Sequence, residues 1–213
     1  MDLRNPIQSV IPSVHGAVLG VLARTNEPLS GRRVAELTAP RFGQTQVNQV
    51  LRKLTASGIV LLESRPPSNL YRLNHDHVAA EGIEALARMW TTLVRRIRAE
   101  LDGWSTPPEA AWLFGSAARG EATAHSDIDI LLVVADGELE TEGIAEVWER
   151  QTEALAEHIK VWSGNVCEMF EMTRSELADA VERDDRLIHD LRGQAISLAG
   201  HDPRALLRRR VLP

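Results

Sequence analysis

Cysteine is nearly missing from this chain of 213 residues, which contains only Cys167. One cysteine cannot close a disulfide within the chain, and it cannot supply the several thiolates of a cysteine zinc cluster. Internal repeats and low-complexity tracts are missing as well. The sequence therefore excludes a disulfide-stabilised scaffold and a zinc module built from cysteines.

Long hydrophobic runs are also absent. No stretch of about eighteen consecutive apolar residues occurs, which is close to the length that a membrane-spanning helix needs. The N-terminal segment lacks the basic start and the apolar run of a secretory signal. We therefore expect a soluble, cytoplasmic protein.

The length allows one large domain or two small ones, each with its own hydrophobic core. Residues 1–77 contain nine Lys or Arg against five Asp or Glu, a net charge of +4, whereas the remainder carries a net charge of −10. We predict a head over residues 1–77, a connecting helix over 78–107 and a body over 108–213. A basic head on an acidic body suggests that any nucleic-acid contact is made by the head.

The head has the pattern of three helices followed by two strands. Apolar residues recur at helical spacing over residues 12–23, 31–38 and 44–56, and two short apolar strands follow at 59–63 and 70–73. In the third helix, the apolar stripe consists of Val47, Val50, Leu51 and Leu54. This order resembles the winged helix-turn-helix domain of many bacterial regulators.

The exposed face predicted for the third helix is rich in amide and basic side chains. Amides can pair with adenine edges, and basic groups can pair with guanine or phosphate in the major groove. The candidate DNA-binding residues on this helix and at the tip of the following hairpin are Gln44, Gln46, Asn48, Arg52, Lys53 and Arg65. A solvated face on a head that mediates dimerisation or another protein contact is the alternative, because a net charge of +4 is modest.

The connector is predicted to be a long helix over residues 76–101. It has one apolar side, which ends before Gly103 and the two prolines Pro107 and Pro108. Its length and apolar side suit the seam of a homodimer and equally suit packing on a sheet of the body. The sequence does not decide between these two arrangements.

Two carboxylates one residue apart stand at the centre of the body. Successive side chains of a strand point to opposite faces, so Asp127 and Asp129 share one face. Like charges at this distance repel unless a cation lies between them. Oxygen ligands of this kind suit Mg²⁺ or Mn²⁺, with substrate phosphates completing the coordination.

Ten residues separate this pair from Gly115-Ser116, which follows a short apolar strand. The pattern Gly-Ser, ten residues, Asp-x-Asp resembles the signature of the polymerase-β-like nucleotidyltransferase superfamily, in the compact form of its minimal members. The resemblance implies an α/β (α+β) fold with a mixed sheet and flanking helices. It also implies that Asp127 and Asp129 are catalytic metal ligands.

The Gly-Ser corner and the arginine after it are the candidate nucleotide-binding residues. Gly115 lets the backbone approach a ligand closely, and the hydroxyl of Ser116 can donate to a phosphate oxygen. Arg119 is a candidate contact for a phosphate or for the acceptor. A structural ion pair between Arg119 and Glu121 is the alternative.

The superfamily's third carboxylate lies on a strand beside the Asp-x-Asp strand, and two residues compete for this place. Alternation puts Glu168 on one face of the predicted strand 166–172 and Glu171 on the other. We favour Glu168 as the third catalytic and metal-binding carboxylate, because a charge inside an apolar central strand needs a partner such as a metal.

The resemblance implies transfer of a nucleoside monophosphate from an NTP to an acceptor hydroxyl, with release of pyrophosphate and with Mg²⁺ or Mn²⁺ as cofactor. The acceptor is a protein, an RNA or a small molecule. The winged-helix head would target or regulate this activity. The alternative is a DNA-binding regulator or antitoxin whose nucleotidyltransferase domain senses nucleotide or is catalytically idle.

Overall fold

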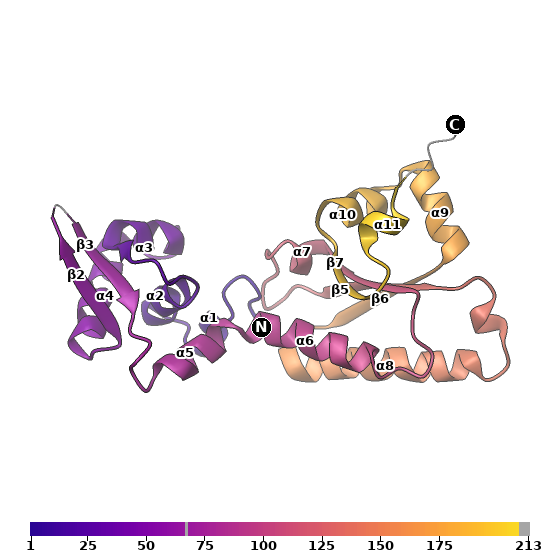
Figure 1. Cartoon of the computed structure of the whole chain (residues 1–213), viewed down its shortest axis with the longest axis horizontal. Helices are drawn as coiled ribbons and strands as arrows, with labels where there is room; N and C mark the ends of the chain where they lie inside the picture. The colour runs from indigo at the N-terminus through magenta and orange to yellow at the C-terminus, as the bar shows by residue number, and fades with distance from the viewer. Residues whose placement is uncertain (67, 209–213) are drawn as a thin grey trace. The chain divides into compact units, whose positions relative to one another are not determined.

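A computed structural model describes residues 1–66 and 68–208 of the chain (Figure 1). The chain forms two compact units, one of Asp2 and Arg4–Trp90 and the other of Met1, Leu3 and Thr91–Pro213. The last five residues of the predicted body lie outside the described part. No helix within residues 1–66 and 68–208 has the length and hydrophobicity that would let it span a membrane.

Four of the five helices of the first unit form in segments that carry helical periodicity, whereas α1 lies before the first of these segments. The third of the predicted helices is confirmed as α4, and its four-residue apolar stripe is buried. The hydroxyl of Ser30 accepts a hydrogen bond from the backbone N of Arg33 (3.1 Å) and so caps α3. The helices are α1 (Ile7–Val10), α2 (Val14–Leu22), α3 (Gly31–Thr38), α4 (Gln44–Ala56) and α5 (Ala80–Ala87).

A small antiparallel sheet completes this unit. The hairpin predicted after α4 is present as β2 (Val60–Arg65) and β3 (Ser68–Leu73), and residue 67 between them lies outside the described residues. A two-residue strand, β1 (Leu29–Ser30), pairs with β3 on its other side. The strand order is therefore β1-β3-β2, and Val60 and Leu73 bury their side chains in the core that the helices form.

The continuous helix expected over residues 76–101 is two helices. Helix α5 ends at Ala87, and α6 (Met89–Leu101) begins after Arg88, whose φ of −91° and ψ of 6° lie outside the helical region. The prediction of one connecting helix was therefore wrong. Apolar residues continue at helical spacing on both sides of Arg88, and periodicity does not register a break of one residue.

The second unit is built on a four-stranded mixed sheet with the order β6-β5-β4-β7. Strands β5 and β6 are parallel, and α8 forms the crossover between them, whereas the other pairs are antiparallel. The elements are β4 (Ala110–Phe114), α7 (Gly115–Ala118), β5 (Ile128–Val134), η1 (Glu138–Glu140), α8 (Ile144–Ser163), β6 (Cys167–Thr173), α9 (Arg174–Arg183), α10 (Arg186–Gln194), β7 (Ile196–Gly200) and α11 (Pro203–Leu206).

Helices lie on both sides of this sheet. One face, which includes Trp112 and Leu131, packs against α9 and α10, and α6 and α8 run along the opposite side (Figure 1). Helix α9 opens with a capping box between Thr173 and Glu176. A mixed sheet with flanking helices is consistent with the predicted nucleotidyltransferase fold. In this sheet, the C-terminal end of β4 lies beside the N-terminal ends of β5 and β6.

Candidate active site

The Gly-Ser corner is the point where β4 turns into α7. Gly115 has a φ of +67°, a conformation that side-chain-bearing residues rarely adopt. A Cβ atom at this position would overlap Oδ2 of Asp129. Two reasons therefore favour glycine at position 115: the backbone conformation and the close approach of the Asp129 carboxylate.

The backbone of Ser116 forms hydrogen bonds with the segment that follows α7. Its carbonyl oxygen accepts hydrogen bonds from the backbone N of Glu121 (2.9 Å) and of Ala122 (3.2 Å). Its hydroxyl makes no hydrogen bond to another described residue, and the side chain is half-buried. The hydroxyl is thus available to a ligand, as the sequence-based assignment requires.

Two of the three predicted carboxylates face each other across neighbouring strands. Asp129 on β5 is in register with Glu168 on β6, and on its other side it is in register with Phe114 on β4. Asp127 directly precedes β5 and is exposed, as is Glu168, whereas Asp129 is half-buried. The arrangement gathers negative charge at one end of the sheet.

The electrostatics of Asp129 reflect this crowding. Burial raises the pKa of the Asp129 carboxyl above its ordinary value, and the negative charges of Glu168 and Asp127 raise it further. Among the described residues, Arg119 is the one whose charge lowers this pKa. An additional positive charge at this place would therefore relieve repulsion that the described residues leave uncompensated.

A divalent cation fits this donor set. No group of three His, Cys, Asp or Glu residues in the described ranges forms a ready-made metal cage. Mg²⁺ does not need one, because it is usually held by one or two carboxylates together with phosphate oxygens and water. The half-buried Asp129, with Glu168 in register on the neighbouring strand, supplies carboxylate oxygens of the kind that this ion accepts.

Glu171, the rival for the third carboxylate, is engaged on the other face of the sheet. Its Oε1 accepts a hydrogen bond from Nε1 of Trp148 on α8 (2.9 Å). The register of Asp129 with Glu168 and this contact of Glu171 both favour Glu168. However, the reason given for Glu168 from the sequence was wrong, because β6 is an edge strand and Glu168 is exposed. Alternation identifies the face of a residue but not the position of its strand in the sheet.

Arg119 forms the ion pair that the sequence offers as one of two alternatives. Its Nε lies 2.8 Å from Oε2 of Glu121, so the structural ion pair is present. This hydrogen bond raises the pKa of Arg119, and the negative charges of Asp190 and Asp129 add to the effect. The guanidinium group thus lies within the electrostatic reach of the carboxylate cluster.

Two further residues border the carboxylates. Burial, together with the charges of Asp129 and Glu168, raises the pKa of the Cys167 thiol to about 12, so this cysteine is not a nucleophile at neutral pH. Phe170, two residues after Glu168 on the same strand face, is 42% exposed, and its ring centroid lies 5.5 Å from that of Phe114. The alternation of β6 could have indicated this aromatic side chain beside the site.

The candidate DNA-binding residues of the first unit are only partly gathered. Gln44, Asn48 and Arg52 line one hollow of about 410 Å³. The other residues that line it are Ser30, Gly31, Arg32, Ser68, Asn69 and Tyr71.

The remaining three candidates lie outside this hollow. The side chain of Gln46 accepts a hydrogen bond from the backbone N of Gly43 (3.2 Å) and thereby caps α4, and Arg65 pairs with Glu63 (3.1 Å). Lys53 is exposed. The hollow therefore combines amide and guanidinium groups from α4 with polar groups from α3 and β3.

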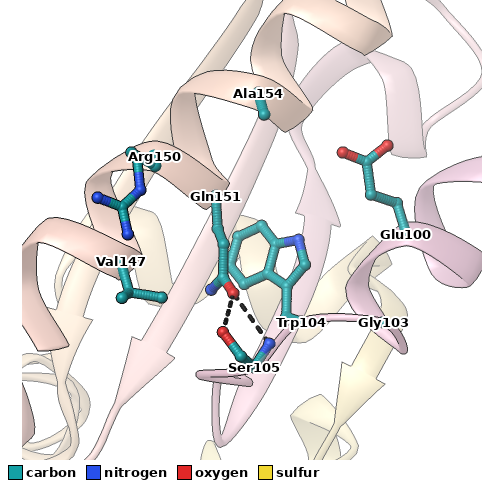
Figure 2. A pocket seen from close by; sticks show the side chains of 8 residues that line it. All are labelled: Glu100, Gly103, Trp104, Ser105, Val147, Arg150, Gln151 and Ala154. Atoms are coloured by element: carbon teal, nitrogen blue, oxygen red, sulfur yellow. Dashed lines mark hydrogen bonds between the residues drawn. The ribbon is translucent and has the colours of Figure 1, made fainter.

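A second hollow, of about 390 Å³, lies between α8 and the turn after α6 (Figure 2). Gln151 Oε1 accepts hydrogen bonds from the backbone N (2.9 Å) and the hydroxyl (2.8 Å) of Ser105 at its edge. The other lining residues are Glu100, Gly103, Trp104, Val147, Arg150 and Ala154. None of the predicted site residues borders it, so it is separate from the carboxylate cluster.

A family model matches a large part of the second unit. Residues 94–186 match the family model of the nucleotidyltransferase domain, a range that includes the Gly-Ser corner and all the candidate carboxylates. Among solved structures, the chain is similar to one described as the crystal structure of a toxin-antitoxin with AMP-PNP. The identity is 21%, the TM-score is 0.34, and the match covers 54% of this chain and 80% of that chain. No curated protein matched the sequence. At the level of the family, the match over residues 94–186 supports nucleotidyl transfer as the activity of this domain.

Proposed function

We propose that the second unit transfers a nucleoside monophosphate from an NTP to an acceptor hydroxyl in a metal-dependent reaction. The observation that carries this proposal is the close approach of the Gly115 corner to the Asp129 carboxylate, with Glu168 in register on the next strand. A phosphate-binding corner and a carboxylate cluster at one end of a sheet are what transfer at an α-phosphorus requires.

Each residue has a distinct task in this proposal. Asp127 and Asp129 would hold Mg²⁺ or Mn²⁺, and the hydroxyl of Ser116 would donate to a phosphate oxygen and orient the triphosphate. When bound, the metal supplies positive charge that stabilises the charge developing on the phosphate oxygens. Arg119 would add a second positive charge.

Glu168 is the proposed proton acceptor. It is exposed, so an acceptor group can reach it from solvent. The acceptor oxygen would attack the α-phosphorus and pass its proton to the Glu168 carboxylate. The bond between the α-phosphorus and the bridging oxygen breaks, and pyrophosphate leaves with the electron pair of that bond.

The test compares wild type with Asp129→Asn in the presence of Mg²⁺ and each α-³²P-labelled NTP. A total protein and RNA extract supplies the acceptor. Asp136→Asn is the matched control, because Asp136 follows the opposite end of β5 and bonds to Ser175. We expect label transfer and pyrophosphate release from wild type and from the control, and neither from Asp129→Asn. Equal label from wild type and Asp129→Asn, or none from wild type with any NTP, would refute the proposal.

For the head we propose a winged-helix domain that binds DNA and thereby targets or regulates the transferase. The hollow lined by Gln44, Asn48 and Arg52 supports this proposal, because it presents amide and basic groups on the exposed side of α4. The alternative, a DNA-binding regulator or antitoxin with an idle transferase domain, predicts DNA binding without label transfer.

DNA binding is tested by titrating fluorescent genomic DNA fragments at several salt concentrations. Loss of two phosphate contacts in Arg52→Ala with Lys53→Ala is expected to lower the slope of log K against log salt by about 2. The double variant Arg24→Ala with Arg88→Ala removes the same charge elsewhere in the first unit and should leave the slope unchanged. Binding without any salt dependence, or equal loss in both double variants, would contradict a DNA-binding head. Sedimentation of the same samples shows whether the chain forms the homodimer that the sequence leaves open.

A further inference from the structure

Asn165 is a buried amide at the junction of α8 and β6, and it is only 2% exposed. Its Nδ2 group donates to two backbone carbonyls, those of Thr123 (3.1 Å) and Ser126 (2.9 Å). Its Oδ1 accepts a hydrogen bond from the N atom of Met1 (2.6 Å). Both ends of the amide are therefore used in the interior of the second unit.

These contacts join the two segments that carry the candidate carboxylates. Thr123 and Ser126 belong to the loop that leads directly into Asp127, and Asn165 stands three residues before Glu168. The loop is closed on itself as well, because the backbone N of Thr123 donates to the Ser126 hydroxyl (3.0 Å). The Asn165 side chain thus ties a closed loop before β5 to the start of β6.

The backbone next to Asn165 continues the connection. The backbone N of Ile128, between the two aspartates, donates to the carbonyl of Val166 (2.9 Å). The backbone N of Asn165 itself donates to the hydroxyl of Ser163 at the end of α8 (3.0 Å). A displacement of the Asn165 amide would therefore move the backbone on either side of Asp127 relative to β6.

We infer that Asn165 is a positioning residue of the active site, which holds the Thr123–Ser126 loop so that Asp127 stands at its place beside Asp129 and Glu168. The inference rests on the proposed function of the second unit. A primary amide of this length is suited to the task, because it offers two donors to the two carbonyls and keeps an acceptor for a third group. Asn165 itself is not proposed to touch the substrate.

The test uses Asn165→Asp in the full-length chain. This change keeps the size and the acceptor, removes both donated hydrogen bonds, and places a negative oxygen against two carbonyl oxygens. The matched control is Asn74→Asp, because Nδ2 of Asn74 also donates to a backbone carbonyl, that of Gly58 (2.8 Å), in the first unit. Both variants lose donors to carbonyls, but only one loses them beside the carboxylate cluster.

Three quantities separate positioning from simple structural support. They are the Kd for Mn²⁺, measured by electron paramagnetic resonance with a non-hydrolysable ATP analogue, the half-saturating Mg²⁺ concentration of label transfer, and the thermal midpoint. For Asn165→Asp we expect Mn²⁺ binding weaker by roughly tenfold or more, with a matching rise in the Mg²⁺ requirement, because a ligand misplaced by about 1 Å loses most of its effect. For Asn74→Asp we expect a lower thermal midpoint and wild-type metal values.

The failure of this inference is distinguishable from that of the proposed function. If wild type transfers no label, the proposed function fails. If wild type is active and folded Asn165→Asp keeps wild-type metal values with only a lower thermal midpoint, Asn165 is structural and the inference is overturned.

A measurement on wild type covers the case in which Asn165→Asp does not fold. The Asn165 side-chain NH₂ signals are then followed by NMR with and without Mg²⁺ and the ATP analogue. Slow hydrogen exchange and a shift on addition of both ligands support the inference. Exchange as fast as that of an exposed amide, or the absence of any shift, overturns it.

Discussion

Replacement of Gly115 by alanine tests whether the corner and the carboxylate form one site. Two penalties are expected. An alanine at a φ of +67° costs roughly 1–2 kcal/mol of stability. The added methyl group also overlaps Oδ2 of Asp129, so this oxygen must move by about 1 Å to restore ordinary van der Waals separation.

The two penalties have different consequences. The backbone cost lowers the thermal midpoint by roughly 2–8 °C, because 1 kcal/mol corresponds to about 2–4 °C in a protein of this size. The displacement of Asp129 acts on the chemistry, and a misplacement of about 1 Å can cost on the order of a hundredfold in rate. Gly115→Ala is therefore expected to be mildly destabilised and nearly inactive.

Gly120→Ala is the matched control, because Gly120 has the same φ of +67° but no atom within 4 Å of the position of a Cβ. Thermal unfolding by circular dichroism and label transfer from α-³²P-NTP are measured for both variants. Both should lose a similar amount of stability, and only Gly115→Ala should lose most of its transfer rate. Equal transfer rates in the two variants would refute the reasoning, since they would show that contact with Asp129 does not matter.

Three further predictions follow from the surroundings of β5 and β6. Burial, and then the neighbouring carboxylates, raise the pKa of Asp129 above its ordinary value of 3.8, so the folded state binds this proton more strongly than the unfolded state does. The stability of the protein therefore falls as the pH rises from the ordinary pKa through the raised pKa of Asp129. Asp129→Asn should therefore raise the thermal midpoint at pH 7, with a gain that shrinks toward about pH 4, and a lower midpoint at pH 7 would contradict this sign. Glu168→Gln should abolish label transfer, whereas Glu171→Gln should keep it. Glu171→Gln should instead lose about 1 kcal/mol of stability in urea unfolding, because the contact with Trp148 is weakened. The reverse pattern would make Glu171 the third carboxylate. Cys167, with a pKa of about 12, should react with iodoacetamide at pH 8 far more slowly than a free cysteine, and rapid labelling of the folded protein would show that the thiol is accessible and ionised.

Local patterns predicted much of the fold because they reflect contacts within one segment. The apolar stripe of α4 repeats at helical spacing, so both the helix and its buried side follow from the sequence. The capping box that opens α9 is likewise a contact between residues three positions apart. Where the pattern contained no signal, at Arg88, the sequence-based prediction failed and one expected helix proved to be two.

The candidate site was likewise predictable from the sequence only in part. The sequence alone determined the Gly-Ser corner, its distance from the Asp-x-Asp pair, and the fact that Glu168 and Glu171 occupy opposite faces of a strand, since these depend on spacing and alternation. Only the tertiary structure decided that Asp129 and Glu168 stand in register and that Trp148 binds Glu171. It also revealed that Asn165 holds the loop before Asp127. Each of these contacts joins segments more than twenty residues apart, and their pairing is set by how strands and helices pack rather than by any local pattern of side chains.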